Sequence, residues 1–314
     1  MVLLARVADR LYWGARYIER AEDTSRIVGA YNEMIIDLPV SEASRWPPLL
    51  SVAGPDPGVE ASLGDDPTES AIIHHLVVDR SNQGSIATSV DMSRTNLRAA
   101  REILPRSAWR AVNTLHQHVE STAPRAVQRQ FRDEFLRRVI DDSRRLDGIL
   151  ESSMNRDNAY RMWRLGRLVE RADMTTRVIG VAAAALLELE QTDVADPHDG
   201  IQWMGVLRSL SARQMYQRAT WGPIDGSEVT RFLLFYAPFP RSVRGCLDQI
   251  REVLVGLPTS LEVIAVVDRT EETLSQCDPV VSDATALDEA VDEVQLAITD
   301  LHEAVMARYV PFTG

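Results

Sequence analysis

A repeated stretch of twenty residues constrains the fold of this chain more than any other feature of its sequence. Residues 11–30 align without gaps with residues 162–181, at a constant offset of 151 positions, and seven of the twenty positions are identical. A duplication of this kind predicts a molecule with two halves, residues 1–150 and 151–314, that are related by a pseudo-twofold axis, as in duplicated helical bundles.

Apolar residues recur in steps of three and four through most of the chain, which is the spacing of one helix face. Small residues on that face, Gly14, Ala21 and Ser25 in the first copy of the repeat, indicate a closely packed neighbouring helix. The sequence therefore predicts an all-α helical bundle in a single domain over residues 1–314. The expected helices cover residues 3–37, 67–78, 85–104, 106–119, 124–153, 155–190, 201–216, 227–235, 241–255 and 284–305.

Three segments carry signals of their own. Residues 39–67 are rich in Pro, Gly and Ser and predict a long surface loop, and Asp66-Pro67 then predicts the cap and first turn of the next helix. Residues 261–267 are β-branched but have no partner strand, so we expect a helix or an extended linker there. The apolar seam of residues 284–305 is narrow, and we expect it to pack on the chain's own bundle rather than on another chain.

All 34 basic residues of the chain are arginines, and no lysine is present. A chain without lysine cannot supply a Schiff-base lysine, a lysine general base or the lysine of a phosphate-binding P-loop. Any cation that it offers to a ligand is a planar guanidinium, which suits carboxylate and phosphate groups. The sequence also has no Gly-rich phosphate loop, so we expect this chain to bind no ATP and no other cofactor.

The charge of the chain is unevenly distributed. Of a net charge of −12, residues 252–314 carry −11, from 13 acidic residues and two arginines. Residues 101–177 carry +5, from 16 arginines and 11 acidic residues. These regions form either solvated helix faces or an arginine-lined anion site with an acidic docking helix. The pI of about 5.0 and the lack of a basic run with interleaved aromatic residues predict no nucleic-acid partner.

The chain carries no signal for export or for membrane insertion. Its first ten residues are charged rather than apolar, and its longest apolar run, residues 178–187, is too short for a membrane span. Two cysteines, Cys246 and Cys277, are too few for a disulfide framework. We therefore expect a cytoplasmic protein with no membrane partner.

Each copy of the repeat places arginines and a glutamate on one side of its helix. At about 100° per residue, an arginine, a glutamate three residues later and a second arginine seven residues after that share a face beside the apolar stripe. We expect half-buried side chains there, and a further arginine directly follows each glutamate. The residues are Arg16, Glu19, Arg20 and Arg26 in the first copy and Arg167, Glu170, Arg171 and Arg177 in the second.

Three interpretations of this Glu-Arg face remain open. The two helices can interlock through buried ion pairs, which specify packing more than they add stability. The arginines can instead bind a carboxylate or phosphate, with the glutamates orienting them. Metal binding by the glutamates is the weakest alternative, because di-metal carboxylate bundles carry a Glu-x-x-His motif that the six histidines do not form here, so we expect no metal site.

The repeat and three further segments resemble the bacterial Alpha-E family, an all-helical domain of poorly defined function that is named for its Glu-Arg motif. The segments follow the family's order and span essentially the whole chain. The departures are Tyr236-Ala237, where an Asp-Pro-like pair is expected, and Gln83, where proline is common. The resemblance rests on residues 17–24 and 168–175 of the repeat, on 79–86 before the arginine-rich helix at 94–101, on 153–157, and on the proline-containing turn at 232–246.

The resemblance implies a part in peptide or amide ligation. Members of this family are typically encoded beside, or fused to, an unusual ATP-grasp protein, often with a transglutaminase-like protein. The ATP-grasp partner would hold ATP and Mg²⁺, activate a carboxylate as an acyl phosphate and pass it to an amine. This chain would then be a non-ATP-binding subunit of the ligase.

The leading hypothesis is that this subunit binds a carboxylate-bearing substrate or peptide. One alternative is a stand-alone enzyme with Glu19 or Glu170 as its general base, although a glutamate beside arginines is a weak base. Another is a structural adaptor whose acidic C-terminal helix docks on a partner. Under the leading hypothesis, the Glu-Arg helices surround the substrate together with Asp79, Arg80, Asn82, Ser85, Arg94, Arg98, Arg101, Arg156 and Asp157.

Overall fold

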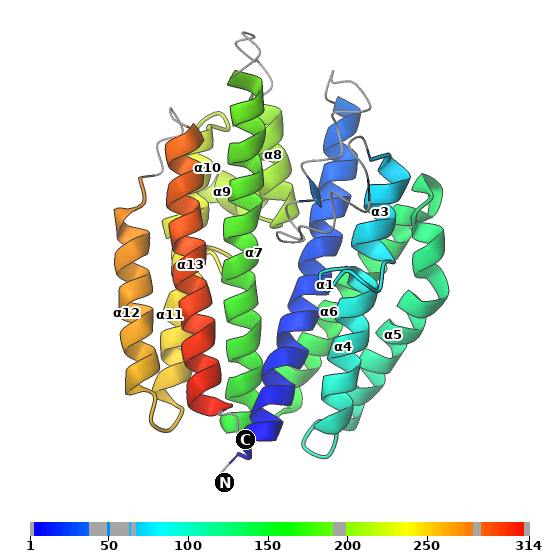
Figure 1. Ribbon diagram of the computed structural model, residues 1–314, viewed down its shortest axis with the longest axis vertical. Helices are drawn as coiled ribbons and strands as arrows, with labels where there is room; N and C mark the ends of the chain where they lie inside the picture. The colour runs from blue at the N-terminus through cyan, green and yellow to red at the C-terminus, as the bar shows by residue number, and fades with distance from the viewer. Residues whose placement is uncertain are drawn as a thin grey trace.

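The computed structural model describes residues 3–37, 49–50, 63, 67–190, 199–278 and 284–310. This part of the chain folds into twelve α-helices and contains no strand, which confirms the predicted all-α class (Figure 1). Each of these helices is too short or too polar to cross a lipid bilayer. The helices are α1 (Ala5–Asp37), α3 (Glu69–Val77), α4 (Ile86–Ala99), α5 (Arg106–Ala126), α6 (Arg129–Ser153), α7 (Asn158–Glu190), α8 (Asp199–Ser209), α9 (Arg213–Ala219), α10 (Gly226–Phe235), α11 (Val243–Val255), α12 (Leu261–Gln276) and α13 (Ala284–Tyr309).

Two groups of four helices stand side by side (Figure 1). In the first group α1, α4, α5 and α6 contact one another in a ring, and in the second α7, α11, α12 and α13 do the same. The central helices α1 and α7 pack against each other and join the groups, and α8 contacts both of them. Each group comes from one half of the sequence, while a two-fold axis that relates the complete halves stays a prediction.

The central helices approach closely because small residues lie where they cross. A Cβ atom at Gly166 of α7 would collide with the carbonyl oxygen of Tyr12 on α1. On another side of α1, Gly14 leaves room for Leu97 of α4, and Ser93 of α4 donates a hydrogen bond of 2.8 Å to the carbonyl oxygen of Gly14. The close neighbour predicted from the small residues of α1 is therefore α4 at this point.

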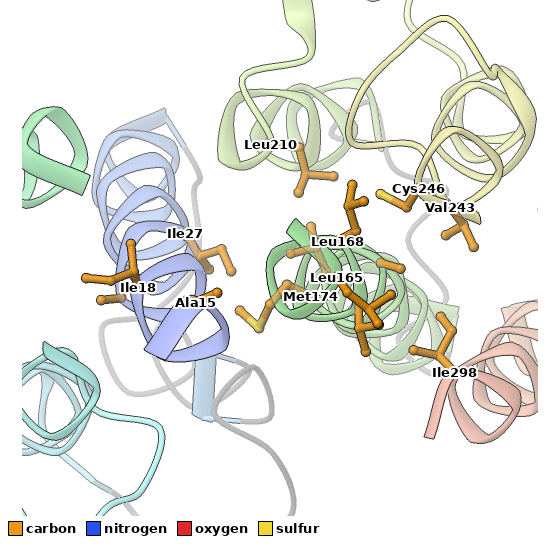
Figure 2. Close-up of a cluster of buried hydrophobic side chains, with 14 of the residues drawn as sticks. Ala15, Ile18, Ile27, Leu165, Leu168, Met174, Leu210, Val243, Cys246 and Ile298 are labelled. Atoms are coloured by element: carbon orange, nitrogen blue, oxygen red, sulfur yellow. The ribbon is translucent and has the colours of Figure 1, made fainter. Parts of the chain in front are cut away.

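Helix α7 is enclosed by its neighbours. In Figure 2, Ala15 and Ile27 of α1, Val243 and Cys246 of α11 and Ile298 of α13 gather around it, and all five side chains are buried. A polar side chain on an enclosed helix must find its hydrogen-bonding partners within the protein, because an unpaired buried polar group is costly. This requirement governs the Glu-Arg residues of the repeat.

The C-terminal helix α13 packs on α7 and α12, as its narrow seam predicts. Its seam residues from Leu287 onward are buried, while acidic residues between them face outward, so the helix covers the second group with one apolar stripe. The buried residues of the stripe are Leu287, Val291, Val294, Ile298, Leu301 and Val305.

Several of the expected helix boundaries are wrong, including the end of the helix expected at 85–104, which stops at Ala99. Helix α5 continues through Pro124 to Ala126 instead of ending at residue 119, since buried side chains such as Ala123 keep this face packed and the proline lies in the last turn. The helix expected at 201–216 is divided into α8 and α9, because Ser211 adopts a left-handed conformation with φ 52°.

The start of α3 differs from the expectation, and the segment 261–267 follows one of its two expected alternatives. The hydroxyl of Thr68 accepts a hydrogen bond from the Ala71 amide, so Thr68 caps α3. Asp66 and nearly all of the predicted loop at 39–67 lie outside the described residues. Residues 261–267 form the first part of α12, so the helical alternative is confirmed.

Candidate functional site

The two Glu-Arg motifs face each other across the α1–α7 interface and pair reciprocally. The Nε of Arg16 donates a hydrogen bond of 2.6 Å to Glu170, and the Nε of Arg167 donates one of 2.6 Å to Glu19. The sequence offset places these residues in equivalent positions of the two copies. The structure thus contains the interlocked ion pairs that were one interpretation of the repeat.

The arginine that follows each glutamate completes the pairing. Arg20 donates to the second oxygen of Glu170 at 2.5 Å, and Arg171 donates to the second oxygen of Glu19 at 2.7 Å. Both oxygens of each carboxylate therefore accept hydrogen bonds from guanidinium groups of the opposite central helix. This arrangement holds α1 and α7 in one register.

The Glu-Arg residues are more deeply buried than their position beside the apolar stripe predicts. Glu19 and Glu170 are 0% exposed, and Arg16 and Arg167 are 7% and 5% exposed. The prediction of half-buried side chains is wrong here because α1 and α7 cover each other's polar face. Arg20, Arg171 and Arg177 keep a partial opening to solvent, with side chains 22%, 16% and 22% exposed.

The guanidinium groups hold both glutamates in the ionised form. Burial alone would raise the pKa of a carboxyl group, but Arg20 and Arg16 outweigh burial and lower the pKa of Glu170 to about 2. Arg167, Arg171 and Arg241 likewise hold the pKa of Glu19 well below its ordinary value. A carboxylate with so low a pKa is a poor proton acceptor, which supports the sequence-based argument against a general base.

The first copy contributes two more buried acids, Glu22 and Asp23, which draw in arginines from other helices. Arg241, in the turn before α11, contacts Asp23 at 2.6 Å and Glu19 at 3.0 Å. Asp147 of α6 binds Arg167. We name this set the Glu19 cluster, and it consists of Glu19, Glu22, Asp23, Arg26, Arg144, Asp147, Arg167, Arg171 and Arg241.

The second copy has a smaller set of charged partners and an aromatic border. We name it the Glu170 cluster: Arg16, Arg20, Glu170, Asp173 and Arg177. The guanidinium of Arg16 lies 5.2 Å from the ring centre of Trp13, and that of Arg20 lies 5.6 Å from the ring centre of Tyr17. Beside them, the Tyr12 hydroxyl and His302 Nδ1 are 2.8 Å apart.

The predicted site residues before α4 are engaged in local structure. Asp79 accepts hydrogen bonds from the backbone and hydroxyl of Ser81. The side-chain amide of Asn82 donates to the carbonyl of His75, and Ser85 caps α4. Arg80 is exposed and contacts Glu120 of α5 and, at 3.9 Å, Asp91 of α4.

The remaining predicted arginines point away from the two central clusters. Arg94 binds Asn113 of α5 at 2.8 Å, and Arg98 and Arg101 are exposed at the end of α4. Arg156 binds Glu151 at 2.8 Å, and Asp157 accepts hydrogen bonds from the first backbone amides of α7. The structure brings together the arginines of the repeat but does not bring these other residues to them.

Sequence reasoning did not single out several members of the Glu19 cluster. Arg241 lies in the proline-containing turn that was recognised, directly before the N-cap residue Ser242, yet its role depends on a contact across the fold. Glu22 was visible as an acid in both copies, since Asp173 occupies the equivalent position. Arg144 and Asp147 gave no signal, because a charged residue on a helix such as α6 is usually solvated.

The described residues include no group of three or more His, Cys, Asp or Glu side chains arranged to hold a metal ion. The carboxylate oxygens of the two central glutamates are instead taken up by arginines. In the described residues, the charged groups of this interface are therefore arginines paired with carboxylates rather than metal ligands.

Comparison with known proteins identifies one family whose model covers nearly the whole chain. The Alpha-E family model, described as a predicted alpha-helical domain with a conserved ER motif, matches residues 3–310. Uncharacterised proteins of Mycobacterium bovis and Mycobacterium tuberculosis are 27% identical over 277 residues, which is 81% of this chain. The chain spans 30% of the length of these relatives. No solved structure matches it.

Proposed function

The chain belongs to the Alpha-E family, and from this premise we propose that it is a non-ATP-binding helical subunit of an ATP-grasp-dependent peptide or amide ligation system. The observation that carries the proposal is the reciprocal pairing of Glu19 and Glu170 with arginines. This pairing connects α1 to α7 and makes both glutamates poor proton acceptors. The chemistry of activation then falls to a partner that binds ATP and Mg²⁺.

The composition of the chain supports this division of labour. Without lysine, the chain has no side-chain amine for a covalent intermediate and no P-loop lysine. Its arginines are suited to holding the carboxylate of a substrate or peptide that the partner activates. The relatives are more than three times as long as the matched region, which agrees with a helical unit that works beside other domains. A transglutaminase-like protein is a further candidate partner, and we place the system in the cytoplasm.

The proposal can be tested by reconstitution with an ATP-grasp protein. The isolated chain should neither hydrolyse ATP nor form amide bonds, and addition of the chain should raise the rate of amide formation by the ATP-grasp protein. A complex of the two should survive size-exclusion chromatography. Turnover of substrate by the isolated chain would refute the subunit role, and an ATP-grasp rate that does not respond to the chain would refute the partnership.

A structural adaptor is the second candidate, because the central arginines and glutamates neutralise one another. The variant Arg20→Gln distinguishes the two, since Arg20 lies at the partly open edge of the network. If the arginines bind substrate, the KM of the reconstituted ligase should rise while the complex still forms. If the network serves packing alone, the variant should lower the melting temperature and leave KM unchanged.

A further inference from the structure

A row of partly exposed side chains follows the edge where α1 meets α13. The guanidinium carbon of Arg20 lies 5.6 Å from the ring centre of Tyr17, and the rings of Tyr17 and Trp13 stack at 5.5 Å. Trp13 then meets the ring of His302 edge-on at 5.2 Å. The contacts run in one order, with Arg20 and His302 at the two ends, along a surface that solvent reaches. We name these four residues the aromatic row.

Arg20 keeps a free donor at its end of the row. Its Nε and Nη2 atoms donate to the two oxygens of Glu170, which fixes the plane of the guanidinium. Its Nη1 atom has no hydrogen-bonding partner among the described residues and is not one of the enclosed unpaired atoms. Since the side chain is 22% exposed, Nη1 can donate to a ligand that arrives from solvent.

The charge around this end of the row is positive. Arg16 and Arg20 share the single carboxylate of Glu170, so one positive charge is left over. The neighbouring acids already have arginines of their own: Asp9 lies 3.8 Å from Arg10, and Asp173 lies 3.1 Å from Arg177. A carboxylate group of a ligand would offset the remaining charge through hydrogen bonds from Arg20.

His302 offers a neutral donor at the other end of the row. Its Nδ1 atom lies 2.8 Å from the Tyr12 hydroxyl, and the two rings are nearly parallel, with an interplanar angle of 7°. Arg16 interacts with the same hydroxyl oxygen, which directs the hydroxyl proton to Nδ1 and places the imidazole proton on Nε2. Burial and Arg16 lower the pKa of His302 to about 4, so the ring is neutral at pH 7. Nε2 has no partner in the part of the chain that the structure describes.

We infer that the aromatic row binds a short peptide that carries a carboxylate group. The carboxylate accepts hydrogen bonds from Arg20, and a backbone carbonyl oxygen of the peptide accepts one from His302 Nε2. An apolar side chain of the peptide packs on Trp13 and Tyr17 between these ends. Tyr12 acts through His302 and is therefore a positioning residue. The site names a substrate class for the proposed function, and its role in ligation rests on that proposal.

The second copy of the repeat does not form an equivalent row. Arg171 corresponds to Arg20, pairs with the other central glutamate and has a side chain that is 16% exposed. The aromatic surface and the hydroxyl are missing beside it, because the corresponding positions hold Leu168 for Tyr17, Arg164 for Trp13 and Trp163 for Tyr12. The inference therefore predicts one peptide per chain, and Arg171 provides a matched control for Arg20.

Calorimetric titration of the full chain with short peptides tests the site directly. The peptide acetyl-Ala-Ala-Phe ends in a free carboxylate, and its C-terminal amide differs only in lacking that charge. A third peptide, acetyl-Ala-Glu-Phe amide, carries the carboxylate on a side chain. We expect saturable binding of at least one carboxylate peptide with a stoichiometry of one, and at least about tenfold weaker binding of the neutral amide.

The stronger of the two carboxylate peptides identifies the source of the carboxylate that the row accepts. Absence of saturable binding by both of them would overturn the inference. Equal affinities of the neutral amide and the carboxylate peptides would also overturn it, because the positive charge at Arg20 would then have no part in recognition.

Matched variants of the two copies separate the row from general attraction between arginine and anions. Arg20→Gln should weaken binding of the carboxylate peptide about tenfold, whereas Arg171→Gln should change it less than about twofold. Each variant removes one guanidinium from a central glutamate, so melting temperatures measured in parallel control for the loss of stability. Equal losses of affinity in the two variants would show that binding does not involve the aromatic row.

The other end of the row is tested through the proton of the imidazole. Nitrogen-15 NMR of the free chain at neutral pH should show His302 protonated on Nε2. Tyr12→Phe removes the hydroxyl that fixes this tautomer, so the form protonated on Nδ1 should appear and peptide affinity should fall about threefold. His302→Phe keeps a ring at this partly exposed position but removes the donor, and should lower affinity about fivefold. A proton on Nδ1 in the wild-type chain, or an unchanged affinity in His302→Phe, would overturn the assignment of this donor.

The two proposals can fail separately. Peptide binding by the isolated chain, together with an ATP-grasp protein whose rate does not respond to the chain, would retain the site and reject the ligase partnership. A ligase that responds to the chain, together with a chain that binds neither carboxylate peptide, would retain the subunit role and reject this site.

Discussion

The Glu19 cluster and the Glu170 cluster are built from the same motif, yet they have developed in different directions. Both centre on a buried glutamate that is held by two arginines of the repeat. Around Glu19 the fold adds further acids and arginines, whereas around Glu170 it adds aromatic rings and Tyr12 paired with His302. The shared pairs hold α1 to α7, and the differences lie in which other elements contact each pair.

The contrast shows how one motif can be extended to different degrees by the fold around it. A buried carboxylate with all its hydrogen bonds satisfied specifies a register but offers nothing to a ligand. A cluster that draws arginines from several other elements ties those elements to the same buried carboxylates. Only the Glu19 cluster is tied in this way, and Met174 occupies the position of Asp23 in the second copy.

Removal of the central glutamates should give the largest effects and should rank the two clusters. Glu19→Gln removes the carboxylate shared by the buried Arg167 and Arg241 and the partly buried Arg171, and should lower the free energy of unfolding by about 3–5 kcal/mol. Glu170→Gln should cost less, since the side chain of Arg20 is 22% exposed and can be solvated. Urea denaturation at neutral pH measures both values. An equal or reversed order would contradict the greater dependence of the Glu19 cluster on its carboxylate.

Removal of Arg241 should separate the clusters next. Arg241→Gln removes the arginine that lies 2.6 Å from the buried Asp23 and one of the arginine partners of Glu19, and should destabilise the chain by about 3 kcal/mol. Arg177→Gln in the Glu170 cluster should cost less than about 1 kcal/mol, because its partner Asp173 is one helical turn away and Arg177 is 22% exposed. Thermal and chemical denaturation of both variants check the difference. Similar losses would show that Arg241 has no special role.

The clusters should also differ in the effect of pH on stability. The pKa of Asp23 is raised in the folded state to about 7 from an ordinary value of 3.8, so its contribution is greatest at low pH and is lost as pH rises through this range. The pKa of Glu170 is lowered to about 2 from 4.5, so its contribution is lost as pH falls through that range. Relative to Asp23→Asn, the wild-type chain should therefore lose stability as pH rises from 3.8 to about 7. A constant difference in the free energy of unfolding would contradict the assignment.

The helix caps beside the clusters should give the smallest difference. Ser242 caps α11 and also donates to the carbonyl oxygens of Tyr236 and Phe239, so it fixes the turn that carries Arg241. Ser242→Ala should cost about 1–2 kcal/mol. Ser85→Ala removes the corresponding cap of α4, where no arginine is positioned, and should cost about 1 kcal/mol or less. Urea denaturation measures both values, and equal losses in the two variants would contradict this positioning role.

The sequence predicted the parts of this structure that depend on local periodicity. The spacing of apolar residues in α1, α7 and α13 specified long helices, and the repeat identified the residues that meet between them. The break at Ser211 was missed because a left-handed serine has no distinctive local signal. The depth of burial of the Glu-Arg face was also missed, since it depends on how two helices cover each other.

The candidate site was predictable only where its members lie within the repeat. Arg16, Arg20, Arg167 and Arg171 were identified because they recur at a fixed offset. Arg144 and Arg241 come from helices and turns that the fold alone brings to Glu22, so no spacing in the sequence connects them. The arginines of α4 entered the hypothesis through the resemblance of their segment to the family, and in the structure Arg94 binds Asn113 while Arg98 is exposed.

A double-mutant cycle across the central interface tests the interlocked pairing most directly. The single variants Arg16→Gln and Glu170→Gln and their combination are compared by the free energy of unfolding, with Arg98→Gln, an exposed arginine of α4, as the control partner for Glu170→Gln. Pairing across α1 and α7 predicts a coupling energy of about 1–3 kcal/mol between Arg16 and Glu170, and additive effects with Arg98 to within about 0.5 kcal/mol. Additive effects for Arg16 and Glu170 would contradict the pairing on which the account rests.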